Sequence, residues 1–167
     1  LLHGWYLPAK VPARGSILFL HGNGENISTH LATVYWLPAE GYNVYLFDYR
    51  GYGASQGEVD LEGSLNDIEA MIGYAASHNT APQKIIVLGH SMGASMGIYA
   101  VSQSPHKKDI AGMISVGAFS DYRVITRDVL SRSWVTWLFQ WPVALTVDNR
   151  FSPINFIADI APVPVVV

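Results

Sequence analysis

The feature that most constrains the fold is an alternation of short apolar runs with segments of helical length. The apolar runs are bounded by Gly, Pro or Asp and have the length of buried strands: Ser16–Leu20, Asn43–Phe47, Lys84–Leu88, Ala111–Val116 and Val163–Val167. The segments between them that are long enough for helices are Ser28–Glu40, Leu61–His78 and Met92–Gln103. Because strands that alternate with helices form mostly parallel sheets covered on both faces, the sequence predicts a doubly wound α/β fold.

Two segments depart from this alternation. Gly4–Leu7 is predicted to be a strand that forms an antiparallel hairpin with the first parallel strand. Residues 120–160 form a long, helical, Trp-rich stretch before the last strand, which is typical of an insertion over the sheet. Within the first helix, Pro38 is expected to cause a kink or an end. We therefore expect a single domain over residues 1–167, with residues 120–160 as a candidate lid.

Composition limits the classes of protein to which the chain can belong. Half of its 167 residues are apolar and 14% are charged, as expected for a sheet buried on both faces. The formal net charge of −3, with scattered Lys and Arg, offers no basic patch for nucleic acid. The absence of cysteine excludes disulfides, zinc–thiolate sites and a thiol nucleophile, and leaves the cellular location open. The most apolar stretch, Trp134–Val147, is shorter than the ~20 residues that span a bilayer.

A G-x-S-x-G motif, Gly89-His90-Ser91-Met92-Gly93, lies between an apolar strand and a helix rich in small residues. A serine at such a turn has a strained backbone that projects its hydroxyl out of the sheet. Small neighbours are needed because the strand and the helix approach closely there, and Gly89 and Gly93 meet that need. A chance Gly/Ser-rich turn is the alternative, and it accounts less well for this placement. We predict that Ser91 is a catalytic nucleophile.

A second motif, His21-Gly22-Asn23-Gly24-Glu25-Asn26, ends the first parallel strand. Attack by a serine on an acyl group creates an oxyanion, which backbone N–H groups can stabilise. We predict that Asn23 and Met92 donate these hydrogen bonds through their backbone N–H groups.

A dinucleotide-binding loop is the competing interpretation of this segment. Gly22 and Gly24 follow a strand, and Asp48 ends the next strand, about where an acid that binds ribose would lie. Ile27 occupies the position of the third glycine, however, and this interpretation leaves the motif around Ser91 unexplained. The sequence therefore favours the oxyanion loop.

The loop Asp48–Ser55 follows the second parallel strand. Asp48 and Arg50 have the appearance of a catalytic acid beside a phosphate-binding arginine. A structural role is favoured, in which both residues hold a tight loop by hydrogen bonds while Gly51 and Gly53 form its turns.

Together the three motifs resemble the α/β-hydrolase superfamily, in particular its small serine hydrolases with HGNxxN, DYRGYGxS and GHSMG sequences. The resemblance covers essentially the whole chain and is to the branch of monoacylglycerol lipases, acyl-protein thioesterases and peptidase-like hydrolases. It implies a Ser-Asp-His triad that uses no cofactor and no metal. It also implies that Ser91 is the nucleophile and that Asn23 and Met92 form the oxyanion hole. Glu25 departs from the pattern, because relatives commonly have a small residue there.

The acid and the histidine of the triad are expected beyond Val167, because in this fold they follow the serine on loops after later strands. Asp121 is the only internal alternative for the acid. His21 and His90 flank the site and are expected to be structural. The other histidines are predicted at surface or helix-end positions without metal-ligand spacing: His3, His30, His78 and His106. The chain begins at Leu1 and not at Met, with no signal-like segment, so we expect the natural N-terminus to be missing. Because the acid and the histidine of the triad are expected beyond Val167, we expect the chain to be incomplete at the C-terminus as well.

Three tryptophans in the insertion, Trp134, Trp137 and Trp141, have the spacing i, i+3 and i+7. They are expected to share one helical face. That face either packs on the sheet or lines an acyl pocket beneath a lid, and the sequence leaves both alternatives open.

The function predicted from these motifs is a serine hydrolase that cleaves carboxylic ester or thioester bonds through an acyl-enzyme at Ser91. Its partner is then a small-molecule acyl substrate, with no nucleic acid. The alternative is a scaffold or binding protein that kept the fold and lost the chemistry. Residues 1–167 alone are expected to be inactive, because they lack the predicted base.

Overall fold

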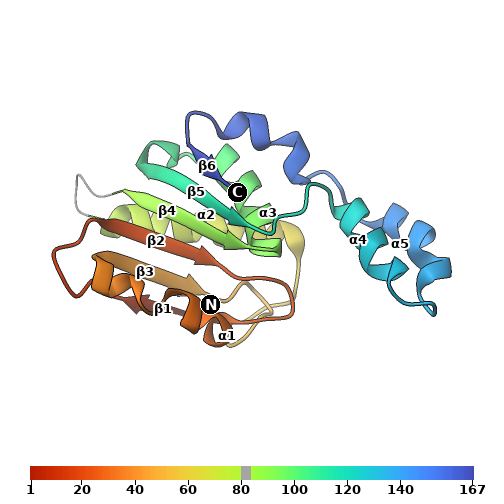
Figure 1. Cartoon of the computed structure of the whole chain (residues 1–167), viewed down its shortest axis with the longest axis horizontal. Helices are drawn as coiled ribbons and strands as arrows, with labels where there is room; N and C mark the ends of the chain where they lie inside the picture. The colour runs from red at the N-terminus through yellow and green to blue at the C-terminus, as the bar shows by residue number, and fades with distance from the viewer. Residues whose placement is uncertain (80–83) are drawn as a thin grey trace.

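The computed structural model describes residues 1–79 and 84–167. Figure 1 shows one twisted sheet with helices on both faces and two further helices that extend beyond one end of the sheet. The strands are β1 (Gly4–Leu7), β2 (Gly15–Leu20), β3 (Tyr42–Phe47), β4 (Ile85–His90), β5 (Ile110–Val116) and β6 (Val165–Val166). The α-helices are α1 (Ile27–Val34), α2 (Leu61–His78), α3 (Met92–Gln103), α4 (Tyr122–Ser131) and α5 (Gln140–Thr146). Short 3₁₀ helices are η1 (Leu37–Glu40), η2 (Lys107–Asp109), η3 (Trp137–Phe139), η4 (Pro153–Asn155) and η5 (Ile157–Ile160).

The six strands lie in the order β1-β3-β2-β4-β5-β6, and every neighbouring pair is parallel except β1 and β3. This arrangement confirms the predicted doubly wound α/β fold. The predicted hairpin between Gly4–Leu7 and the first parallel strand is wrong, because β1 pairs with β3. Both edges of β2 are occupied, by β3 and β4, so β1 pairs with the outer edge of β3 instead.

Strand β2 is buried on both of its faces, which explains why its sequence is an uninterrupted apolar run. Leu18 and Leu20 belong to the larger core, which also contains apolar residues of α2 and α3. Ile17 and Phe19 point to the opposite face and belong to a second core with residues of α1. The alternation of side chains along one strand thus feeds two cores, and the helices hold the sheet from both sides.

The predicted bounds of α2 and α3 agree with the structure, whereas the predicted helix Ser28–Glu40 is divided. Its α-helical part ends at Val34, and η1 follows after a short turn, with Pro38 at its N-terminal end. Proline is tolerated at that position because the first turn of a helix leaves its N–H groups unpaired. Strand β6 is shorter than the predicted Val163–Val167, in keeping with the two prolines, Pro162 and Pro164, which cannot donate to a sheet.

Residues 120–160 are helical, as predicted, but the three tryptophans do not share one helical face. Trp134 lies in the turn after α4, Trp137 begins η3, and Trp141 lies in α5. The Thr136 hydroxyl donates to the Leu130 carbonyl in this turn, which separates the two helices. The alternative in which these rings pack on the sheet is also wrong, because all three are exposed.

All three tryptophan rings are in fact exposed, and Trp134 is 88% exposed. In Figure 1, α4 and α5 lie side by side, away from the body of the sheet. Within residues 1–79 and 84–167, no helix combines the length and apolar character needed to cross a bilayer.

Candidate active site

The predicted motifs converge because they follow neighbouring strands at the same edge of the sheet. His21–Asn26 follows β2, Asp48–Ser55 follows β3, and Ser91 follows β4. The carboxyl ends of parallel strands meet at one edge, where open α/β sheets place their ligand sites. This edge is therefore the candidate active site.

The backbone of Ser91 is strained as predicted for a nucleophile at a sharp turn. Its φ is 51° and its ψ is −115°, and no other non-glycine residue in the described part of the chain has a positive φ. Such a conformation costs about 1–3 kcal/mol and persists only where the surroundings impose it. Here the Ser91 N–H donates to the Val116 carbonyl at 2.8 Å, and the Ser91 carbonyl accepts from the Ser95 N–H at 3.1 Å.

Gly89 and Gly93 allow the strand, the turn and the helix to approach one another. A Cβ atom at Gly89 would lie 2.5 Å from the Ala94 Cα. A Cβ atom at Gly93 would lie 2.3 Å from the carbonyl oxygen of Leu20, in β2. Both positions are closed by backbone atoms rather than by flexible side chains, so the need for small residues beside Ser91 is met as the sequence analysis expected.

One side chain, that of Tyr52, contacts the side chains of both predicted oxyanion donors, Asn23 and Met92. Met92 is the first residue of α3, so its N–H has no intrahelical acceptor. The Tyr52 hydroxyl donates to the Asn23 side-chain Oδ1 at 2.8 Å and lies 4.0 Å from the Met92 Sδ. Burial raises the pKa of Tyr52, so this hydroxyl stays protonated and remains a donor at neutral pH.

Tyr52 is a candidate site residue that the sequence analysis missed. The sequence favours a structural role for the loop that contains Tyr52. The signal for its contact with Asn23 is the order of the strands, because the loop after β3 then lies beside the loop after β2.

His21 is buried at the start of the oxyanion loop. Burial lowers its pKa, so the ring is neutral at pH 7, and its Nδ1 lies 2.8 Å from the Gly22 carbonyl. Its own carbonyl accepts from the fully buried Tyr49 hydroxyl at 3.0 Å. These contacts anchor the loop that carries Asn23, and they fit the predicted structural role of His21.

Asp48 ties the oxyanion loop to the loop after β3. Its Oδ1 accepts from the Ile27 N–H at 2.9 Å, and its Oδ2 accepts from the Ala54 N–H at 3.2 Å. His3, from the segment before β1, lies 3.4 Å from the same Oδ2. Both oxygens of the Asp48 carboxylate therefore have partners in neighbouring loops, as expected for a structural residue.

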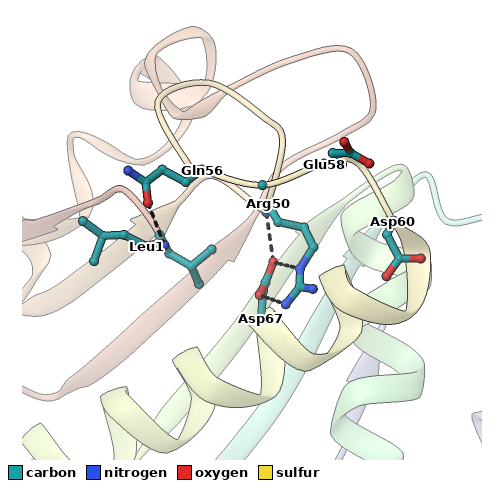
Figure 2. Close-up of a pocket in the computed structure, with 8 residues that line it drawn as sticks. Leu1, Arg50, Gln56, Glu58, Asp60 and Asp67 are labelled. Atoms are coloured by element: carbon teal, nitrogen blue, oxygen red, sulfur yellow. Dashed lines mark hydrogen bonds and ion pairs between the residues drawn. The ribbon is translucent and has the colours of Figure 1, made fainter.

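Arg50 is held by Asp67 of α2, as Figure 2 shows. The Arg50 N–H, Nε and Nη2 all donate to the Asp67 carboxylate, at 2.8–3.0 Å. These hydrogen bonds raise the pKa of Arg50. The contact reaches further than the local bonds that were predicted, because it fastens the loop to a helix.

A cavity of about 470 Å³ lies beside this ion pair, lined by Leu1, Leu2, Arg50, Gln56, Gly57, Glu58, Asp60 and Asp67 (Figure 2). None of Ser91, Asn23 and Met92 lines it. The cavity is therefore separate from the candidate active site. The Arg50 guanidinium that lines it is already paired with Asp67.

Asp121 caps α4. It accepts from the Val124 N–H at 2.9 Å and from the Asn149 Nδ2 at 2.6 Å. Burial acts to raise the pKa of Asp121, but these hydrogen bonds outweigh it and lower the pKa.

Within residues 1–79 and 84–167, no histidine hydrogen-bonds to the Ser91 hydroxyl.

The histidines outside the two motifs are engaged elsewhere in the structure. The prediction of a surface or helix-end position is wrong for His30, which is buried because α1 packs its ring against Phe19 of β2 at 5.1 Å. His78 lies against the Tyr74 carbonyl, and His106 lies 3.6 Å from Asp109.

Comparison with known proteins identifies the family from the sequence. Residues 11–156 match the family model described as serine aminopeptidase S33. The uncharacterized protein YfhR of Salmonella typhi is 31% identical over 179 residues, which cover 99% of this chain and 58% of YfhR. The chain therefore spans little more than half the length of that relative.

A lipase and a solved structure extend the comparison. The monoglyceride lipase of Saccharomyces cerevisiae is 32% identical over 110 residues, which cover 62% of this chain and 35% of the lipase. The crystal structure of an alpha-beta hydrolase from Vibrio vulnificus is similar with a TM-score of 0.79 and 21% identity, and the match covers 98% of this chain and 57% of that one.

Proposed function

Because this chain belongs to the serine aminopeptidase S33 family of α/β-hydrolases, we propose that it is a serine hydrolase of the esterase and lipase type. The bond cleaved is a carboxylic ester or thioester, and the acyl group is carried on Ser91. The observation that carries this proposal is the strained backbone of Ser91, with a φ of 51° at the turn between β4 and α3. Strained backbones of this kind cluster at active sites, and this one belongs to the turn that holds a catalytic serine in G-x-S-x-G motifs.

In the proposed reaction, the Ser91 hydroxyl oxygen attacks the acyl carbon while a base takes its proton. The N–H groups of Asn23 and Met92 hold the oxyanion, and the alcohol or thiol then leaves with the proton. Water hydrolyses the acyl-enzyme by the same steps and restores Ser91. The base and its acid partner are proposed to lie outside residues 1–167.

The substrate class is inferred from two supporting features. A relative of this chain is named a monoglyceride lipase, which favours an apolar acyl chain. The insertion at 120–160 exposes several large apolar side chains, including Trp134, Trp137 and Trp141. We propose that this insertion is a lid whose apolar side chains contact the acyl chain of the substrate.

The proposed activity is tested with the complete gene product, on p-nitrophenyl esters of increasing acyl length and on an acyl thioester. We expect turnover of the esters, and almost none from the isolated 167-residue chain if the base lies outside it as proposed. If the folded, complete product hydrolyses none of these substrates, the scaffold alternative is favoured. Robust turnover by residues 1–167 would contradict the proposed position of the base.

Replacing Tyr52 with Phe removes the hydroxyl that holds the Asn23 side chain and leaves the ring in place. One lost hydrogen bond of about 0.5–1.5 kcal/mol corresponds to a decrease in kcat of roughly 2- to 12-fold. Steady-state kinetics of the complete product should show this decrease in kcat with little change in KM. Tyr6→Phe is the matched control, because the Tyr6 hydroxyl donates to Asn43, away from the site. Equal kcat in Tyr52→Phe and the parent would show that Tyr52 does not position Asn23.

A further inference from the structure

A carboxylate and two imidazoles from different elements converge beside Ser91. Glu25 lies in the loop after β2, His30 lies in α1, and His90 is the last residue of β4. One donor atom from each side chain lies within 4.8 Å of the other two. The closest pair is the Glu25 Oε2 and the His30 Nε2, at 2.5 Å. Spacing along the sequence does not indicate this cluster, because folding alone brings His90 to the other two residues.

The pairing of Glu25 with His30 does not account for the third member. The His90 Nδ1 is buried and has no hydrogen-bond partner within the described residues. A buried imidazole nitrogen without a partner is costly, so its position calls for a ligand. The His90 ring also lies 5.3 Å from the His30 ring, so the two imidazoles face the same small region.

Glycine at residue 22 lets the donor groups approach one another. A Cβ atom there would lie 2.9 Å from the Glu25 Oε2 and 3.3 Å from the His90 Nδ1. Any side chain at residue 22 would therefore press on two of the three donor groups and separate them. Zinc–ligand bonds of 2.0–2.2 Å in tetrahedral geometry place ligand atoms about 3.3 Å apart. The Glu25 side chain is 41% exposed, so it is free to move away from His30 toward that spacing.

We propose that Glu25, His30 and His90 form a binding site for Zn²⁺. Two imidazole nitrogens and one carboxylate suit zinc, whereas Ca²⁺ and Mg²⁺ prefer oxygen ligands throughout. Three protein ligands leave the fourth tetrahedral position to water. The bound ion joins the loop that carries Asn23 to β4, the strand that ends at His90 beside Ser91. The resemblance to serine hydrolases implied no metal, and the site is an addition to that expectation.

The test is isothermal titration of the metal-free, purified protein with Zn²⁺, which does not depend on the proposed hydrolase activity. We expect one Zn²⁺ per chain with micromolar or tighter affinity and no comparable binding of Mg²⁺. Glu25→Gln and His30→Gln should each weaken the affinity at least tenfold, with thermal unfolding recorded to show that the variants fold. His106→Gln is the matched control, because His106 pairs with Asp109 on the surface and does not belong to the cluster of Glu25, His30 and His90.

A second measurement uses the unmodified protein, so it does not depend on the folding of any variant. X-ray absorption at the zinc edge of the loaded protein should show two imidazole nitrogens at about 2.0–2.1 Å. The proposal is overturned if no saturable zinc binding occurs, if the Glu25 and His30 variants bind as tightly as the parent, or if the ion has only oxygen ligands.

Discussion

Ser91→Ala is expected to abolish ester hydrolysis by the complete gene product, with a loss in kcat of about 10⁴- to 10⁶-fold. The alanine removes the oxygen that forms the acyl-enzyme, so the oxyanion donors at Asn23 and Met92 have no covalent intermediate to stabilise. Because catalytic groups of this kind act as a unit, the loss of the nucleophile alone removes most of the rate enhancement. The measurement is steady-state hydrolysis of a short p-nitrophenyl ester.

The control for this variant is Ser77→Ala, on the exposed surface of α2. Its turnover and its thermal unfolding should equal those of the parent. Thermal unfolding of Ser91→Ala is expected to be unchanged or slightly higher in temperature, because active-site residues are selected for activity and not for stability. Retention of more than a few per cent of the activity by Ser91→Ala would rule out Ser91 as the nucleophile.

Gly93→Ala is expected to destabilise the protein strongly, although alanine favours a helix by about 1 kcal/mol over glycine. The added methyl group would lie 2.3 Å from the Leu20 carbonyl oxygen and 2.5 Å from that of His21. Backbone atoms of β2 cannot rotate away, so α3 must move outward. Overpacking of this kind costs about 3 kcal/mol or more, which lowers Tm by roughly 6–12 °C.

The matched control is Gly112→Ala in β5, where the nearest atom to an added Cβ is the Pro164 carbonyl oxygen at 3.4 Å. Its Tm is expected to change by less than about 2 °C, since an added Cβ there meets ordinary contacts. Calorimetry of both variants measures the difference. If Gly93→Ala melts at the same temperature as the parent, α3 and β2 do not approach as closely as the structure shows.

The sequence predicted those helices and strands whose bounds depend on neighbouring residues, through apolar periodicity, capping and turn residues. The bounds of α2 agree because its apolar residues recur every three to four positions and Asp60 caps its start. The turn at Ser91 was predictable because its glycines and its place between strand and helix appear in the sequence. The apolar run of β2 likewise predicted a strand buried on both faces.

Features that depend on partners distant in the sequence were not predictable. The pairing of β1 with β3 is decided by which strand edge is left free, and neighbouring positions in the sequence do not reveal that. The burial of His30 and its approach to His90 arise from the packing of α1 on the sheet. The spacing of the tryptophans suggested one helix, but a turn at residues 132–136 separates α4 from η3.

The most direct test of the account is to locate the covalent adduct of a fluorophosphonate by mass spectrometry of the complete gene product. A single adduct on the Ser91 hydroxyl is predicted, because only an activated serine displaces fluoride from phosphorus at a useful rate. Ser91→Ala should carry no adduct under the same conditions. An adduct on another residue, or a folded parent that stays unlabelled, would contradict the claim that the turn between β4 and α3 holds a catalytic nucleophile.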